Sequence, residues 1–134
     1  MKTIISFDKK PLGLYSEDQI NLDWNTPKRI MGVKSDRSNI VTDPFDSSRN
    51  VLEIKYPQGK VGQEEDAGGA QWRLRFEESF NKCTAEYQVM FPIGFDFVKG
   101  GKLPGLCGGT SPAGGKKSDG SDGFSARIMW RERG

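Results

Sequence analysis

The sequence predicts an all-β domain, an antiparallel β-sandwich or β-jelly roll. Three segments alternate apolar and polar side chains with the period of two that is typical of half-buried strands: residues 70–76, 84–92 and 124–131. The 17 glycines and 7 prolines divide the chain into short runs, and no long amphipathic pattern of helical period is found. Because 134 residues can bury one small core, we expect a single domain over residues 1–134.

The first seventy residues predict short elements. Residues 15–24 carry a helix start, with Ser16 as the N-cap and Gln19 at the capping-box position, but the segment is too brief for a helical domain. Residues 38–50 predict a short strand and a turn, and residues 51–57 predict a strand closed by Pro57. Residues 60–69, with an acidic run at 64–66, predict an exposed loop.

Each alternating segment assigns its side chains to two faces. On the apolar faces we expect three sets: Trp72, Leu74 and Phe76; then Ala85, Tyr87, Val89 and Phe91; and last Phe124, Ala126, Ile128 and Trp130. The opposite faces of the first and last segments are unusually basic, with Gln71, Arg73 and Arg75 on one and Ser125, Arg127, Met129 and Arg131 on the other. If both strands belong to one sheet, its outer face is a cationic groove.

The guanidinium fork of arginine matches carboxylates, sulfates and phosphates, so this groove predicts an anionic ligand. Residues 98–134 carry seven Lys or Arg against three Asp or Glu, whereas the rest of the chain is slightly acidic. The pattern is equally compatible with scattered surface arginines paired to Glu77, Glu78 or Glu132. The net charge of +2 is too close to zero to indicate nucleic acid or a membrane.

The stretch 95–109, FDFVKGGKLPGLCGG, predicts a glycine-rich loop around Lys99 and Lys102 that lets a ligand approach the backbone closely. The spacing of a phosphate-binding P-loop is not met around Lys116, and the βαβ context is missing, so we reject a nucleotide site. The polar tract 108–123 predicts a long loop inside the domain. Asp119 and Asp122 resemble part of a calcium loop, but a turn with Asx-type hydrogen bonds explains them better.

The chain contains no histidine, which excludes a Ser-His-Asp triad, a Cys-His dyad and His-ligated zinc. Proton transfer would have to use Tyr, Lys, carboxylates or water. Cys83 and Cys107 allow one disulfide or none and form no CxxC motif. No stretch has the length of a membrane span, and the N-terminal residues do not form a signal-peptide core.

The segments GGAQWRLRF, AEYQVMFPIGFDFVKGGKLPGLCGG and DGFSARIMWRERG resemble the core of polysaccharide lyase family 14 and are similar to the family 20 glucuronan lyases. The earlier segments LGLYSEDQINLDW and DPFDSSRNVLEIKYPQGKVG also fit, so the resemblance covers nearly the whole chain. It implies a β-jelly roll whose concave sheet binds an acidic polysaccharide, such as alginate or glucuronan, and cleaves it by β-elimination.

The resemblance also implies roles for residues. Lys102 resembles the family's active-site lysine, and Ser125 and Arg127 resemble its substrate-contacting serine and arginine; we take these three as catalytic candidates. The implied substrate-binding residues are Gln71, Arg73, Lys99 and Arg131. A lysine can act as a base when desolvation and neighbouring cations lower its pKa. We assign no metal-ligating residue and expect no cofactor.

In the family, catalytic tyrosines lie on the strand after the MWR motif, and this chain ends at Gly134 before reaching such a strand. We therefore expect the domain to be incomplete at its C-terminal end. The alternatives to a lyase are a non-catalytic module that binds anionic carbohydrate and a fragment without a ligand. We further expect an extracellular monomer that binds an acidic polysaccharide and neither nucleic acid nor a membrane.

Overall fold

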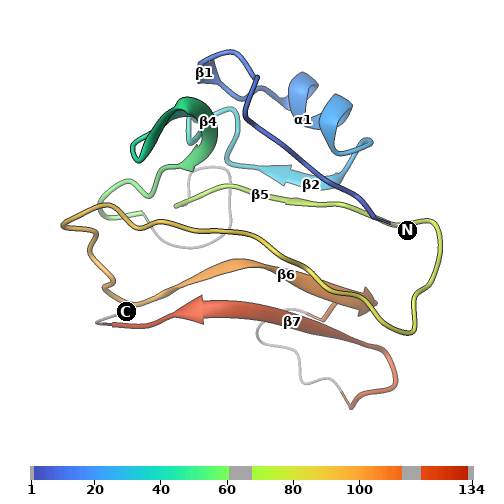
Figure 1. The fold of residues 1–134 in the computed structure, drawn as a ribbon. Helices are drawn as coiled ribbons and strands as arrows, with labels where there is room; N and C mark the ends of the chain where they lie inside the picture. The colour runs from blue at the N-terminus through green and yellow to red at the C-terminus, as the bar shows by residue number, and fades with distance from the viewer. Residues whose placement is uncertain (1, 61–67, 113–118, 133–134) are drawn as a thin grey trace. The chain divides into compact units, whose positions relative to one another are not determined.

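The computed structural model describes residues 2–60, 68–112 and 119–132. The chain forms two compact units, residues 1–79 and residues 80–134. The predicted acidic loop at 60–69 and the predicted polar loop at 108–123 fall partly outside the described residues. Every described strand pairs antiparallel, and the described part of the chain has one helix of seven residues (Figure 1). The predicted fold class, all-β and antiparallel in the manner of a β-sandwich or jelly roll, is confirmed.

The first unit contains two small sheets and the helix. Strands β1 (Gly13–Leu14), β3 (Ser38–Asp43) and β4 (Asp46–Ile54) form one sheet in the order β1-β3-β4, and β2 (Lys28–Met31) pairs with β5 (Gln71–Arg73). The turn between β3 and β4 contains Pro44, and the Asp43 carboxylate accepts a hydrogen bond from the Phe45 amide at 2.9 Å. The two strands predicted within residues 38–57 are therefore present, but the second begins five residues earlier than predicted, at Asp46, and ends at Ile54.

Helix α1 (Glu17–Asp23) begins where the capping box predicts it. The Ser16 hydroxyl accepts a hydrogen bond from the Gln19 amide, and the Gln19 side chain accepts one from the Ser16 amide at 2.9 Å. These two bonds satisfy backbone donors that a helix N-terminus leaves without partners. Ile20 is the buried residue of this helix and joins the core.

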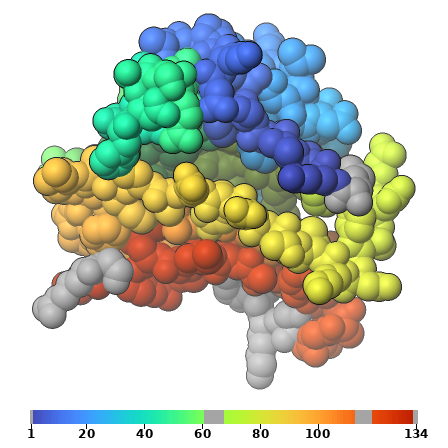
Figure 2. Space-filling view, in the orientation of Figure 1, coloured from blue at the N-terminus to red at the C-terminus, as the bar shows by residue number. Residues whose placement is uncertain are grey.

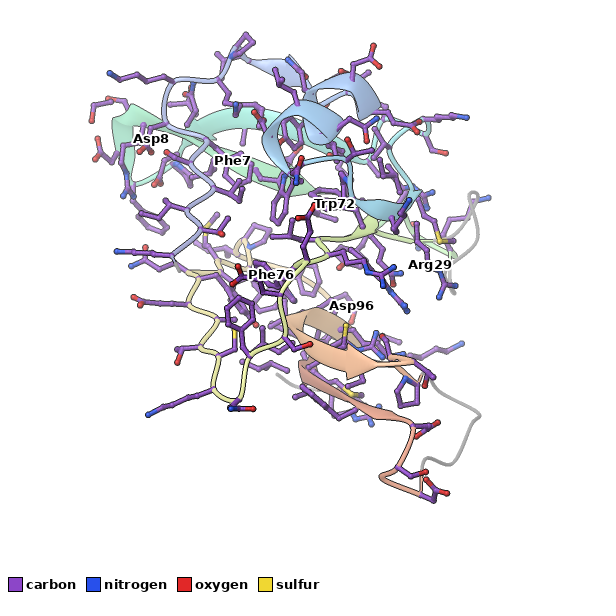
Figure 3. All side chains as sticks on the ribbon, turned by 90° about the vertical axis from the view of Figure 1, so that its right-hand side faces the viewer. Phe7, Asp8, Arg29, Trp72, Phe76 and Asp96 are labelled. Atoms are coloured by element: carbon purple, nitrogen blue, oxygen red, sulfur yellow. The ribbon has the colours of Figure 1, made fainter. Side chains whose placement is uncertain are left out.

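The core of the first unit consists of four buried side chains, with five half-buried or partly exposed ones packed around them. The buried set is Tyr15, Ile20, Val33 and Ile40, and the surrounding set is Phe7, Trp24, Ile30, Leu52 and Trp72. Trp72 lies on the α1 side of β5 (Figure 3), with its ring centroid 5.5 Å from that of Trp24. The apolar face predicted for the QWR segment is therefore correct at Trp72, although the strand ends at Arg73.

The second unit is built on a hairpin of β6 (Gly101–Gly109) and β7 (Gly123–Trp130), which lie side by side in Figure 1. Strand β7 was predicted. The glycine-rich loop predicted for 95–109 is wrong from Gly101 onward, because these residues pair with β7 and form a strand. Residues 84–92 were predicted to form a strand and do not, because they join none of the described ladders.

Aromatic contacts hold residues 84–98 to the hairpin. The Phe91 ring lies 5.4 Å from Trp130 and 4.9 Å from both Phe95 and Phe97, measured between ring centroids. This segment (yellow to gold) lies against the hairpin (orange to red) in Figures 1 and 2. Trp130 is 7% exposed, whereas Phe124 and Ile128 of the same β7 face are more than half exposed. The predicted apolar face of β7 is therefore buried at one end only.

Candidate functional site

The register of the hairpin places the three catalytic candidates on one face. Lys102 lies opposite Met129, and Ser125 lies opposite Cys107. Residues directly opposite each other in an antiparallel pair point to the same side, and alternate residues of one strand share a face. Ser125, Arg127 and Met129 therefore form one row on β7, and Lys102 joins that row from β6.

A β-bulge in β6 is needed for this arrangement. Between Lys102 and Gly105 the strand advances by three residues, while its partner advances by two, from Met129 to Arg127. A bulge adds one residue to one strand and shifts the alternation beyond it. Pro104 lies inside the bulge, where its missing N–H is not required by the ladder.

On the opposite face of the hairpin, aromatic side chains of β7 pack over glycines of β6. A Cβ atom on Gly101 would overlap the Trp130 ring, and one on Gly108 would lie 2.6 Å from the Phe124 ring. Each aromatic side chain thus covers a glycine on the neighbouring strand. These glycines are explained by close packing, rather than by the ligand approach that the sequence suggested.

The face that carries Lys102, Ser125 and Arg127 is open and cationic. Lys102 and Ser125 are exposed, and Arg127 is half-buried. Within residues 80–112 and 119–132, neither Lys102 nor Arg127 has an ion-pair partner. A guanidinium held on a strand with no carboxylate beside it is available to an anion.

The alternative of arginines paired to nearby glutamates finds no support in the described residues. No ion pair among them joins Glu77, Glu78 or Glu132 to an arginine. The described ion pairs that are seen lie in the first unit, on Lys10, Arg49 and Lys55.

Lys99 and Arg131 lie at the end of the hairpin next to Lys102. Lys99 is exposed, and its positive φ of 60° places it in a turn that the Gly100 amide closes by a 3.2 Å hydrogen bond to the Phe97 carbonyl. A Cβ atom on Gly100 would lie 3.3 Å from the Arg131 Cα atom, so Arg131 is beside this turn. The second unit therefore brings together five of the predicted site residues.

The other two predicted residues, Gln71 and Arg73, share a face of β5 in the first unit. Their strand pairs with β2, with Met31 opposite Gln71 and Lys28 opposite Arg73. Trp72, between them in sequence, points to the core on the other side. Both Gln71 and Arg73 are half-buried. Gln71 and Arg73 thus belong to the first unit, and the other five predicted site residues belong to the second.

Sequence reasoning missed Lys28. Two like charges directly opposite each other in an antiparallel pair destabilise it, and Lys28 and Arg73 have no ion-pair partner in the part of the chain that the structure describes. The pair forms a second cationic spot, on the Gln71 face. Its sequence signal was weak, because the β2 segment showed only a short apolar run.

Cys107 was also missed as a member of the hairpin face. It lies opposite Ser125, is exposed, and is a free thiol, as is the exposed Cys83. The disulfide that the sequence left open is therefore not formed. Thiol reagents can therefore modify Cys107 on the face that carries Ser125.

The hydroxyl groups of Tyr15 and Tyr87 form hydrogen bonds within the protein. Tyr15 is fully buried, and its hydroxyl donates to Asp23 at 2.6 Å and accepts from the Trp24 indole N–H at 3.1 Å. Burial, reinforced by the hydrogen bond to Asp23, raises the pKa of Tyr15 well above its usual value. Tyr87 was predicted to lie in the core but is half-buried, and its hydroxyl donates to the Pro104 carbonyl at 2.9 Å.

Asp119 forms the predicted Asx turn. Its carboxylate accepts hydrogen bonds from the Ser121 hydroxyl at 2.6 Å and the Ser121 amide at 2.8 Å. These bonds hold the pKa of Asp119 below its usual value. Among the residues described, no group of three Cys, Asp or Glu side chains is arranged to hold a metal ion, and no helix has the length and hydrophobicity to cross a membrane.

Comparison with known families gives one match. The family model described as Polysaccharide lyase 14 matches residues 44–134, which is more than half of the chain. The matched range contains all seven predicted site residues and leaves out Lys28 and helix α1. The part of the resemblance that we placed at residues 12–24 thus lies outside the match. No curated protein and no solved structure matches the chain.

Proposed function

The chain belongs to the polysaccharide lyase 14 family, and we propose that it cleaves an acidic polyuronate, such as alginate or glucuronan, by β-elimination. The observation that carries this proposal is the β6–β7 face, where Lys102, Ser125 and Arg127 meet without an acidic partner among the described residues. A polyuronate carries one carboxylate on each sugar, so an open row of cations suits it. Extracellular action on such a polymer, by a monomer, is part of the proposal.

The reaction determines what each group has to do. A base removes the proton at C5 of the uronate, the bond from C4 to the glycosidic oxygen breaks, a C4=C5 double bond forms, and the leaving oxygen receives a proton. Removing the C5 proton places negative charge on the carboxylate, so a cation beside that carboxylate stabilises the transition state. Arg127, half-buried and fixed on β7, is our candidate for this cation.

Lys102 and Ser125 flank Arg127 on the same face. We assign proton transfer to Lys102 and a hydrogen bond to the sugar to Ser125, since a lysine can exchange a proton and a hydroxyl can donate and accept. Lys99 and Arg131, at the end of the hairpin, would bind carboxylates of neighbouring sugars. Gln71 and Arg73 would hold further sugar or carboxylate groups on β5.

A second candidate function is binding without cleavage. It is favoured by two tyrosines whose hydroxyl protons are already donated within the protein. The buried Tyr15 donates to Asp23, and Tyr87 donates to the Pro104 carbonyl. A module of this kind would hold anionic carbohydrate through the same arginines and would release no product. The two candidates share the ligand and differ in the reaction.

The test incubates the chain with alginate and with glucuronan and follows the ultraviolet absorbance of the new C4=C5 double bond. Lysis predicts a signal that Arg127→Ala abolishes and that Lys34→Ala, a change of an exposed cation outside the predicted site, leaves intact. Saturable, salt-sensitive binding without product would establish the second candidate instead. Absence of both binding and product with either polymer contradicts the proposal.

The two free thiols supply an independent test of where the polymer binds. Because Cys107 lies on the proposed face and Cys83 outside the hairpin, a thiol reagent should label Cys107 more slowly when polyuronate is present and label Cys83 at an unchanged rate. Equal protection of both thiols, or of neither, would argue against binding on this face.

A further inference from the structure

Lys102 reaches the face of Arg127 only because of the β6 bulge. With Gly105 opposite Arg127, a regular ladder would place Leu103 opposite Met129 and Lys102 opposite Trp130. In that register Lys102 would point to the Trp130 side of the hairpin. The bulge instead places Lys102 opposite Met129, on the side of Arg127 and Ser125. Whatever keeps the bulge in place therefore decides where Lys102 points.

The bulge has a specific partner outside the hairpin. The Tyr87 hydroxyl donates a 2.9 Å hydrogen bond to the carbonyl of Pro104, which is one of the two residues within the bulge. A bulge interrupts the regular pairing of backbone groups, so a side-chain donor can take the place of a ladder partner. Pro104 itself has no N–H to contribute to the ladder.

The same segment is attached to the hairpin at a second point. Phe91, four residues after Tyr87, packs its ring on Trp130, and Trp130 lies opposite Gly101. The two attachments, to Trp130 across from Gly101 and to Pro104, are on either side of Lys102 along the hairpin. Residues 84–98 are therefore attached to the hairpin on both sides of the position of Lys102.

We propose that Tyr87 is a positioning residue that holds the β6 bulge and thereby keeps Lys102 on the face of Arg127 and Ser125. The inference rests on the proposed function, in which Lys102 transfers a proton. Since the Tyr87 hydroxyl proton is donated to Pro104, we assign Tyr87 no proton transfer to the substrate. Its effect on the reaction passes through Lys102.

The kinetic test is Tyr87→Phe, which keeps the ring and removes the hydroxyl. We expect kcat to fall about 10-fold with KM changed little, since small misplacements of a reacting group cost up to about 10²-fold. Tyr56→Phe, a matched loss of a hydroxyl in the first unit, should leave both constants unchanged. A kcat equal to that of the unaltered chain would overturn the proposal.

A double variant separates positioning from an independent role. If Tyr87 acts through Lys102, Tyr87→Phe should add no loss to that of Lys102→Ala, because the group being positioned is already gone. Multiplicative losses would show that Tyr87 contributes on its own and would overturn the proposal.

A cross-linking test needs no activity and therefore stands if the proposed function fails. In a background of Cys83→Ser and Cys107→Ser, the pair Lys102→Cys with Met129→Cys should form a disulfide, because these positions face each other. Adding Tyr87→Phe should slow this cross-link at least several-fold and favour the pair Leu103→Cys with Met129→Cys, which face each other in the regular register. Equal rates with and without Tyr87→Phe would overturn the proposal, whether or not the chain cleaves polyuronate.

Discussion

In the first unit the ammonium group of Lys10 lies 2.6 Å from the Asp23 carboxylate, whereas Lys102 of the second unit has no carboxylate partner among the described residues. The same contrast holds for Arg49, which contacts Asp43 at 2.5 Å, and Arg127. A cation with a built-in partner contributes to folding, and one without a partner is available to a ligand. Lys10 and Arg49 of the first unit are thus neutralised by built-in carboxylates, whereas Lys102 and Arg127 of the second are left open to a ligand.

The two units also differ in how many apolar side chains they bury. The first unit has four fully or nearly fully buried apolar side chains at its centre, while Trp130 is the buried apolar residue of the second unit within the described ranges. Exposed large apolar side chains occur in both units, for example Leu22 and Phe45 in the first and Ile93 and Ile128 in the second, so the difference lies in the buried core. The comparison predicts that substitutions in the first unit will affect stability and those on the β6–β7 face will affect activity.

The sharpest test of this contrast replaces each of the two lysines, Lys102 and Lys10, by alanine. We expect Lys102→Ala to lower kcat/KM for polyuronate more than about 100-fold, since a group acting in the transition state is lost, with no change in Tm. Lys10→Ala should lower Tm and leave kcat/KM unchanged, because it removes the partner of Asp23. Loss of activity in the Lys10 variant at a temperature where it is folded would break the comparison.

A core substitution should have the largest effect on stability. Ile40 is 1% exposed in the core cluster of the first unit, and Ile40→Ala should lower the free energy of unfolding by about 2–5 kcal/mol. Ile128→Ala, at a β7 position that is 61% exposed, should lower it by less than about 1 kcal/mol. Denaturant titration of both variants measures the difference, and similar losses would contradict it.

The Lys10–Asp23–Tyr15 network predicts how stability depends on pH. Burial raises the pKa of Asp23. Hydrogen bonds from Lys10 and Tyr15 together lower this pKa by more than burial raises it, so the net shift is downward. A folded-state pKa below the unfolded value stabilises the fold above that unfolded value, about 4, and the contribution is lost as pH falls through the folded-state pKa.

Asp23→Asn should therefore lower stability at pH 7, by about 1–3 kcal/mol for a lost charged hydrogen-bond partner, and flatten the acid limb of the Tm profile. Profiles of the variant and the unaltered chain should converge at low pH. Asp18→Asn, at an exposed helix position, supplies the control and should leave the acid limb unchanged. Parallel profiles for Asp23→Asn and the unaltered chain would refute the assignment.

The smallest expected effect concerns Lys28, a cation of the first unit without an ion-pair partner among the described residues. If the Lys28–Arg73 pair binds a carboxylate, Lys28→Ala should raise KM several-fold with kcat unchanged, and raised salt should reduce the difference. Lys34→Ala, at an exposed lysine outside the β2–β5 pair, is the control. A lower KM, or a gain in stability with no kinetic change, would show that the pair is only a repulsion.

The sequence by itself determined the features that depend on neighbours along the chain. Period-two alternation predicted the FSARIMWR strand and the direction of Trp72, and the capping box predicted the start of α1 at Ser16. The order of residues in the motifs also determined the family, which the match over residues 44–134 confirms. These signals are local, so a single sequence is enough to read them.

Only the tertiary structure decided the pairing and its register. Alternation alone places Lys102 and Cys107, five residues apart, on opposite faces, but the bulge brings both to the side of Ser125. Pairing also made a strand of the glycine-rich segment 101–109, left residues 84–92 outside the described ladders, and set Lys28 opposite Arg73. The physical reason is that register depends on which backbone groups and side chains meet across strands distant in sequence, and no local pattern contains that information.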